Sequence, residues 1–338
     1  MRRSLVDVYR CPVTHEGLAL EGANGSDEVE QAELVAPSGT RYAVREGVPV
    51  FVPEQGLTEE ERATQVDYDE SASEKYDAAV DWQFRVFYED EDVVREGMVD
   101  LLRLPPDAKV LEIGCGTGRD SFRIARRLGL GGIFFVQDLS EQMVLKARER
   151  LQGEDNHGEG ELAYFVSTAR LLPFPDGYFD AVFHFGGFNN FSEPTRTLGE
   201  ITRVVRTGGR VVVGDEAVPP WLREHDFGRM LIENNPLFAH TVPLEHLPTN
   251  ARDVTLRWVI GGCFYLIDYE VGDGPPPVDL DLPHKGWRGG TIRTRYFGRL
   301  EGVTPEAREL AVAAARARGV SVHEWLEDLV RRNAGDAQ

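Results

Sequence analysis

The stretch K-V-L-E-I-G-C-G-T-G, from Lys109 to Gly118, decides the fold of this chain. In its first half, Val110, Leu111 and Ile113 form a short apolar run that suits a strand buried on both faces of a sheet. Three glycines follow within five residues, and glycine accepts positive φ and lets a ligand approach the backbone closely. Residues 119–128 then carry apolar side chains at helical spacing. Strand, glycine turn and helix together predict a nucleotide-type binding site.

The spacing of the glycines separates two kinds of ligand. The dinucleotide fingerprint is G-x-G-x-x-G and cradles a pyrophosphate. Here the order is G-x-G-x-G, and Arg119 stands where the last glycine of that fingerprint would be. Glu112, at the strand end, can bind a ligand ammonium but would repel a pyrophosphate. Both details favour S-adenosylmethionine (SAM), which carries an ammonium and a cationic sulfonium. A generic tight turn in an α/β protein is the alternative.

At this point the sequence resembles the class I SAM-dependent methyltransferases. Residues 172–182, L-P-F-P-D-G-Y-F-D-A-V, are a strong match to the same superfamily. Residues 183–190, F-H-F-G-G-F-N-N, are similar to the F-G-x-x-N segment of the ubiquinone/menaquinone C-methyltransferase branch. The resemblance covers about Val110 to Glu216. It implies an α/β, Rossmann-like sheet of seven strands, with SAM as methyl donor and S-adenosylhomocysteine as product.

The same stretches supply the candidate cofactor residues. Asp138 ends a second apolar run twenty residues after Gly118, where a carboxylate can accept both hydroxyls of a ribose. Thr168 follows a third run, at a position where related enzymes often have Asp or Asn facing the adenine amino group, and its hydroxyl can still accept a hydrogen bond. The set expected at the cofactor is Glu112, Gly114, Cys115, Gly116, Thr117, Gly118, Asp138, Leu139, Thr168, Ala169 and Phe185.

Catalysis of methyl transfer rests mainly on aligning the nucleophile with the methyl–sulfur bond. A base can assist by removing a proton from the nucleophile. His184 is the best candidate, because it lies on the strand that follows Asp180 and ends near the expected methyl group. A strand alternates its faces, so a packed core histidine is the competing interpretation. Rival bases in the later part of the chain are His225, His240, His246 and His284.

Composition limits the classes of function. The chain has 338 residues and a formal net charge of −20, which argues against a protein that mainly grips nucleic acid. Its three cysteines lie far apart and suggest no disulfide framework. The N-terminus lacks an apolar signal core, and no apolar run is long enough to span a membrane. A soluble cytoplasmic protein with no membrane or nucleic-acid partner is therefore expected.

Residues 1–56 are expected to form a small β-rich module. Short apolar runs separated by glycine and proline indicate strands. The module resembles the zinc ribbons attached to some methyltransferases, an rRNA guanine methyltransferase family among them, and a free-standing methyltransferase activator. Those ribbons use two C-x-x-C pairs, whereas here Cys11 and His15 supply at most two ligands and Thr14 takes the place of a cysteine. A degenerate ribbon without metal follows, with Cys11 as a small buried apolar residue.

The remaining boundaries come from composition. Residues 57–75 are acidic and predict a linker or a loosely held helix. Residues 76–218 form the expected core, whose leading aromatic cluster closes over a ligand or simply packs. Residues 219–338 hold the substrate side, with Val254–Tyr269 and Thr291–Leu300 as the last two sheet strands. Between these lies a cationic loop, where Trp287 and Arg288 are candidate substrate residues; pairing of its cations with Asp279 and Asp281 is the alternative.

The tail is expected to be a pair of helices. Thr304-Pro305 starts the first, Gly319 ends it, and Ser321 with Glu324 forms a capping box for the second. Its apolar stripe suggests packing or a homodimer contact. The function predicted from the whole sequence is SAM-dependent methyl transfer to a small, aromatic or acidic molecule. An rRNA methyltransferase and a non-catalytic SAM-binding scaffold are the alternatives.

Overall fold

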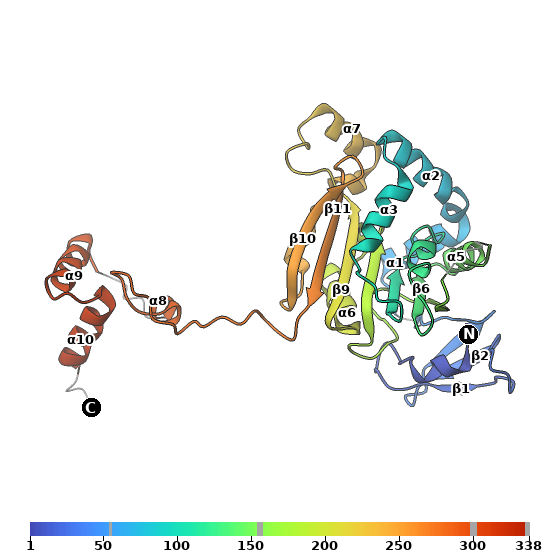
Figure 1. Ribbon diagram of the computed structural model, residues 1–338, viewed down its shortest axis with the longest axis horizontal. Helices are drawn as coiled ribbons and strands as arrows, with labels where there is room; N and C mark the ends of the chain where they lie inside the picture. Colours follow the sequence, from blue (N-terminus) through green and yellow to red (C-terminus); the bar gives the residue numbers. More distant parts are fainter. Residues whose placement is uncertain (54–55, 154–157, 298–302, 335–338) are drawn as a thin grey trace. The chain divides into compact units, whose positions relative to one another are not determined.

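A mixed seven-stranded sheet forms the centre of the chain in a computed structural model that describes residues 1–53, 56–153, 158–297 and 303–334 (Figure 1). The strand order is β10-β11-β9-β8-β5-β6-β7. The strands are β5 (Lys109–Ile113), β6 (Ile133–Asp138), β7 (Glu161–Val166), β8 (Phe179–Phe185), β9 (Val205–Glu216), β10 (Ala251–Val259) and β11 (Phe264–Val271). The first five run parallel, and β11 is antiparallel to both β9 and β10. This confirms the predicted α/β class I methyltransferase sheet.

Helices α4, α5 and α6 connect β5 to β6, β6 to β7 and β8 to β9, because a parallel pair needs a crossover. The order switches between β5 and β8, which are neighbours although β6 and β7 come between them in sequence. Ligands of open α/β sheets bind at such a switch, beyond the carboxyl ends of the strands. The helices of this part are α1 (Glu59–Asp67), α2 (Ser73–Val86), α3 (Glu91–Asp100), α4 (Ser121–Ala125), α5 (Glu141–Gly153), α6 (Pro194–Val204) and α7 (Asp226–Asn234).

The first seventy residues contain more regular structure than expected. A four-stranded antiparallel sheet holds β1 (Ala19–Glu21), β2 (Ala32–Val35), β3 (Arg41–Arg45) and β4 (Val48–Pro49). Residues 59–86 are helical throughout, with a π-helical turn at Tyr68–Ala72 between α1 and α2. Residues 57–75 were expected to be either a linker or a loosely held helix, and the structure shows a helix. Thr58 caps α1 and forms a capping box with Glu61.

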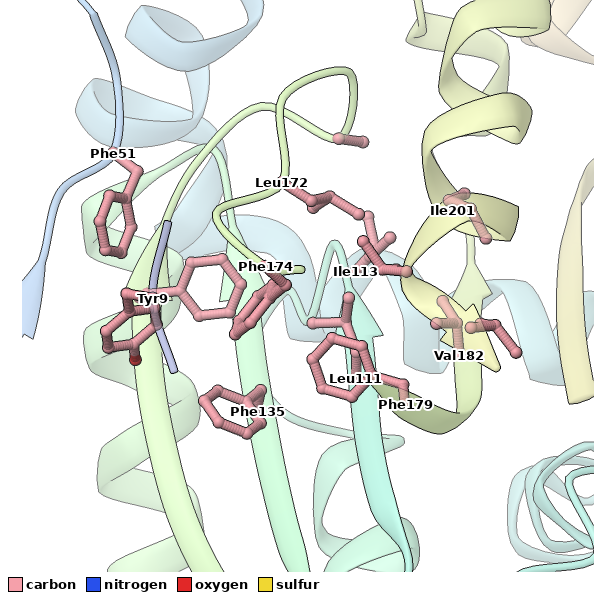
Figure 2. Packing of buried hydrophobic residues seen from close by; sticks show 14 of the residues in the cluster. Tyr9, Phe51, Leu111, Ile113, Phe135, Leu172, Phe174, Phe179, Val182 and Ile201 are labelled. Atoms are coloured by element: carbon pink, nitrogen blue, oxygen red, sulfur yellow. The ribbon is translucent and has the colours of Figure 1, made fainter. Parts of the chain in front are cut away.

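The N-terminal module shares its core with the large sheet. Tyr9 and Phe51 pack beside Phe135 and Phe174 (Figure 2), and the Tyr9 ring centroid lies 4.9 Å from that of Phe51 and 5.6 Å from that of Phe174. The backbone N–H of Phe51 donates to the carbonyl of Val166 at 2.7 Å, at the edge strand β7. The module is therefore continuous with the sheet in packing and in hydrogen bonding.

The chain divides into two compact units, Met1–Pro275 and Pro276–Gln338. The expected boundaries at residues 57, 76 and 219 stay predictions. The second unit contains α8 (Ile292–Phe297), α9 (Pro305–Ala317) and α10 (Val322–Ala334), so the predicted helix pair at the tail is present. A homodimer through these helices stays a prediction. Of the helices in the described ranges, none has both the length and the apolar character needed to cross a membrane.

The prediction for the last two strands was wrong. Val254–Tyr269 is not one strand but most of the β10–β11 hairpin, because Ile260, Gly261 and Gly262 all take positive φ and reverse the chain. Thr291–Leu300 is no sheet strand, since its described part forms α8, and residues 298–300 lie outside the described ranges. The hairpin already supplies both closing strands of the sheet, so the cationic loop does not lie between them.

Candidate functional site

The glycine turn has the positive φ angles that its sequence predicts. Gly114, Gly116 and Gly118 have φ angles of 66°, 53° and 85°. Residues other than glycine rarely adopt this region. A Cβ on Gly116 would lie 3.2 Å from the Tyr76 ring, and one on Gly118 would lie 3.0 Å from Cα of Ala147 in α5. Glycine at these two positions therefore allows both the turn and the close approach of its neighbours.

Asp138 lies beside this turn at the end of β6. Its carboxylate accepts the backbone N–H of Gly116 at 2.9 Å and that of Ser140 at 3.0 Å. Burial raises the pKa of Asp138 to about 6, although the N–H groups of Ser140 and Gly116 act in the opposite direction. A carboxylate offers about four lone-pair sites, so two remain for a ligand. Asp138 is thus fixed in place and still able to accept a diol.

A cavity opens above the glycine turn, and we call it the first cavity. Most of the expected cofactor residues line it, together with His184 and the helical segment 59–76. Its wall contains Glu61, Thr64, Gln65, Tyr68, Tyr76, Gly114, Gly116, Gln137, Asp138, Leu139, Ser140, Met143, Thr168, Ala169, His184, Gly186, Gly187, Asn190 and Phe191. The sequence interpretation missed the contribution of α1, although the capping-box pair Thr58 and Glu61 marks a helix start there.

Five expected cofactor residues do not line this cavity, and one of them, Phe185, lines the second cavity described below. Glu112 is 2 % exposed and accepts the hydroxyl of Ser121, and burial, followed by the charge of Asp120, raises its pKa well above the usual value. The Glu112 carboxyl therefore lies behind the turn, not in the wall. Thr117 donates to Asp77 at 2.6 Å. The other two residues are Cys115 and Gly118.

Thr168 lines the cavity, but its hydroxyl is already engaged. It donates to Oε1 of Glu61 at 2.5 Å and accepts the backbone N–H of Arg170 at 3.3 Å. Arg170 pairs with Glu61 at 2.5 Å, and both side chains are 5 % exposed or nearly so. Burial raises the pKa of Glu61, but hydrogen bonds from Arg170 and Thr168 outweigh this and lower it. This buried pair holds the start of α1 against the end of β7.

Arginine side chains hold α2 over the glycine turn. Arg119 lies 2.8 Å from Asp77, 2.6 Å from Asp81 and 2.6 Å from Glu91. Arg150, in α5, also pairs with Asp77, at 2.8 Å. Arg119 is the residue that replaces the last glycine of the dinucleotide fingerprint. Its role here is to fix α2, which positions Tyr76 against the turn.

His184 lies at the end of β8 and is 1 % exposed. Its Nδ1 is 2.8 Å from the carbonyl oxygen of Ile113, so Nδ1 carries the proton and donates, which leaves Nε2 as the acceptor nitrogen. Nε2 has no partner among the described residues, and burial lowers the pKa of the ring. His184 lines the first cavity, whereas the four rival histidines line neither this cavity nor the one described next. A catalytic role for His184 stays a prediction.

A second cavity adjoins the first. The two share Tyr68, Tyr76, Gly186, Gly187 and Asn190. The second cavity extends from there between α2 and α7, which lie at the same end of the sheet (Figure 1). Its further wall combines aliphatic, aromatic and amide side chains with one basic and one acidic residue: Ala79, Val80, Trp82, Gln83, Val86, Phe87, Arg95, Phe185, Glu216, Leu231, Asn234, Asn235, Leu237, Phe238 and Phe264. Phe185, expected at the cofactor, lines this cavity instead.

The candidate substrate residues, Trp287 and Arg288, are part of the second compact unit. The Arg288 guanidinium lies 5.2 Å from the centre of the Trp287 ring. Their carbonyls accept the first N–H groups of α10, from Val322 at 2.9 Å and His323 at 3.1 Å. The alternative was that the cations of the loop pair with nearby carboxylates. Asp281 does not form such a pair, because it pairs with Arg293 at 2.9 Å. A substrate role for these two residues stays a prediction. The reason for it, that their loop lies between the last two sheet strands, no longer applies.

No cluster of three or more His, Cys, Asp or Glu side chains in the described ranges could hold a metal ion. Cys11 is fully buried, and its sulfur lies 3.2 Å from the hydroxyl oxygen of Tyr42. The likeness of the N-terminal module to a zinc ribbon is therefore unsupported.

Known proteins match the central part of the chain. Residues 111–213 match the family model described as "Methyltransferase domain". A demethylmenaquinone methyltransferase of Beutenbergia cavernae is 36% identical over 128 residues, 38% of this chain and 48% of the relative. A ubiquinone/menaquinone biosynthesis C-methyltransferase, UbiE, of Yersinia pestis is 33% identical over 111 residues, 33% of this chain and 43% of the relative. The chain thus spans about half the length of the relatives it matches.

Among solved structures, phosphoethanolamine N-methyltransferase 2 of Haemonchus contortus in complex with SAM aligns with a TM-score of 0.48 at 13% identity, over 68% of this chain and 63% of that one. Magnesium protoporphyrin IX methyltransferase of Synechocystis PCC 6803 aligns with a TM-score of 0.47 at 14% identity, over 62% and 99%. Residues 111–213, the part of the chain that matches the methyltransferase family model, hold the glycine turn, Asp138 and His184.

Proposed function

We propose that this protein transfers the methyl group of SAM to a small molecule. The observation that carries the proposal is the pair of adjoining cavities, which share one wall beyond the carboxyl end of β8. The first has the groups that fit SAM, and the second has room for an acceptor. SAM supplies an electrophilic methyl group on a sulfonium. The protein's own contribution is to hold two molecules in contact and to exclude water.

The first cavity fits SAM in its chemistry. Asp138 keeps two lone-pair sites for the ribose hydroxyls, and Leu139, Met143 and Ala169 provide apolar wall for an adenine ring. Gly116 leaves the backbone open to a ligand, since it has no Cβ. Because His184 lines this cavity and not the second, its unpartnered Nε2 favours contact with the cofactor over contact with the acceptor.

The proposal is tested by calorimetric titration with SAM, S-adenosylhomocysteine and NAD⁺. We expect the first two to bind and NAD⁺ not to bind. Asp138→Asn keeps the shape of the side chain but removes the charge that accepts the diol, and charged hydrogen bonds contribute roughly 1.5–3 kcal/mol each. The variant should therefore lose ten-fold or more in affinity for SAM.

Asp107→Asn is a matched control for this variant. Asp107 is exposed and lies just before β5, at the end of that strand opposite the glycine turn. It should bind SAM like the wild type. Tight NAD⁺ binding, or equal SAM affinity in the Asp138 and Asp107 variants, would contradict the proposal.

A further inference from the structure

The second cavity is unusual in how its charges are compensated. Of the described residues in its wall, Arg95 is the basic one and Glu216 is the acidic one. Arg95 is buried, pairs with Glu91 at 2.7 Å and also contacts Asp120. Its guanidinium lies over the rings of Phe84 and Phe185, at 5.3 and 6.0 Å from their centres. The positive charge of Arg95 is therefore already matched by two carboxylates.

Glu216 has no such match. It is the last residue of β9, and within the described part of the chain no cationic side chain forms an ion pair with it. Its neighbour Asp215 is fully buried and accepts the backbone N–H groups of Asn189 at 2.6 Å, Glu216 at 2.8 Å and Gly187 at 3.2 Å. Asp215 is thus a fixed carboxylate that holds the loop after β8, and Glu216 stands beside it in the cavity.

Burial, and then the charge of Asp215, raises the pKa of Glu216 well above its usual value. Buried charges in proteins are normally paired, and a carboxylate that lacks a cation in the protein can obtain one from a ligand. The rest of the wall agrees with a cation, because the faces of aromatic rings attract one. Phe185, Phe264 and Tyr68 supply such rings. An anionic acceptor would meet a carboxyl pair and no free positive charge.

We propose that the second cavity binds an amine as the methyl acceptor, with Glu216 as its ion-pair partner and the residue that takes its proton. The inference rests on the proposed function and specifies its substrate class. The Glu216 carboxylate removes one proton from the ammonium and becomes a carboxylic acid. The freed nitrogen lone pair forms the N–C bond as the methyl–sulfur bond breaks, and that electron pair stays on sulfur. The products are a methylated ammonium and neutral S-adenosylhomocysteine.

The first test uses the wild-type chain and three probes that differ only in one group: 2-phenylethylamine, 2-phenylethanol and phenylacetate. Binding is measured calorimetrically with S-adenosylhomocysteine saturating the first cavity. We expect the amine to bind at least ten-fold more tightly than the alcohol, and the acid to bind most weakly. Equal binding of amine and alcohol, or tightest binding of the acid, would overturn the inference. With labelled SAM, the amine should gain one methyl group by mass spectrometry.

The second test compares Glu216→Gln with Glu233→Gln. Glu233 is an exposed residue of α7 that does not line the cavity, so it controls for the loss of one negative charge near the site. Glu216→Gln should lose the preference for the amine, at least ten-fold, with unchanged affinity for S-adenosylhomocysteine. Glu233→Gln should keep that preference. If Glu216→Gln instead weakens SAM but not S-adenosylhomocysteine, the carboxylate serves the sulfonium and the inference is wrong.

The two proposals fail in different ways. If the wild type binds neither SAM nor S-adenosylhomocysteine, the methyltransferase function falls and this inference falls with it. If both bind while the three probes show no charge preference, only the amine class is excluded. The wild-type measurement decides this by itself and does not depend on the folding of any variant.

Discussion

The hydroxyl of Thr168 donates a hydrogen bond to Oε1 of Glu61 at 2.5 Å, across 107 positions of the chain. This contact joins the segment expected to bind adenine to α1, in a stretch that was expected to be a linker or a loosely held helix. Arg170 completes the arrangement by pairing with Glu61. The start of α1, which lines the first cavity, is therefore held by the same stretch that follows β7.

Removing the arginine of this pair tests its contribution to stability. Arg170→Ala leaves Glu61 buried without its counter-charge, and breaking a buried pair in this way costs about 3–5 kcal/mol. Urea denaturation should show this loss, and SAM affinity should fall because α1 loosens. Arg62→Ala, an exposed arginine of the same helix, should change stability little. A similar cost in both variants would show that the buried pair is not what holds α1.

Binding of SAM should depend on pH through Asp138. Its pKa is raised to about 6, so the carboxylate that accepts the ribose hydroxyls is lost as pH falls below that value. The neighbouring carboxylate of Asp69 acts in the same direction, and Tyr68 also faces this group. Calorimetric affinity should therefore decline between about pH 7 and pH 5. Asp138→Asn should show weak affinity with no such slope.

The same raised pKa affects the ligand-free protein with the opposite sign. The folded state holds the Asp138 proton up to about pH 6, whereas the unfolded chain releases it near the ordinary aspartate pKa of 3.8. In that window the folded state binds more protons, so the Asp138 contribution to stability declines as pH rises from about 4 to about 6. Denaturation of wild type and Asp138→Asn across this window should show the decline in the wild type alone. Parallel curves would contradict the assignment.

Gly116→Ala should weaken SAM binding more than it weakens the fold. The residue at this position has a φ of +53°. An added Cβ would lie 3.2 Å from the Tyr76 ring, at the wall of the first cavity. The strain should cost about 1–3 kcal/mol of stability. Gly199→Ala, in α6 with nothing within 4 Å of the added carbon, should instead stabilise by about 0.4–1 kcal/mol. Calorimetry and thermal denaturation of both variants check this.

The N-terminal module should contain no stoichiometric zinc. Cys11 lacks the partners of a tetrahedral site, and its sulfur contacts the Tyr42 hydroxyl. Elemental analysis of the purified protein should find well under one zinc per chain, and a chelator should leave the melting temperature unchanged. One zinc retained after dialysis against chelator would show that the module is a working ribbon.

The sequence by itself determined the parallel strands of the central sheet and the position of its glycine turn. Val110, Leu111 and Ile113 are apolar, three glycines follow, and Asp138 ends the next buried run; these are local patterns that need no distant partner. The helical tail was also readable, because Thr304-Pro305, Gly319 and the Ser321–Glu324 box are local signals.

Only the tertiary structure decided which side chains reach the cavities. Glu112 sits behind the turn because its strand face is covered by Ser121, and Thr168 is engaged by Glu61 from a helix more than a hundred residues earlier. Long alternating segments misled the assignment of the last strands, since periodicity cannot tell a hairpin of two strands from one strand, nor an exposed helix from an edge strand. Glu216 became a candidate for binding the acceptor only in the tertiary structure. Its lack of a counter-charge depends on the packing between α2, α3 and α7, which no local sequence pattern specifies.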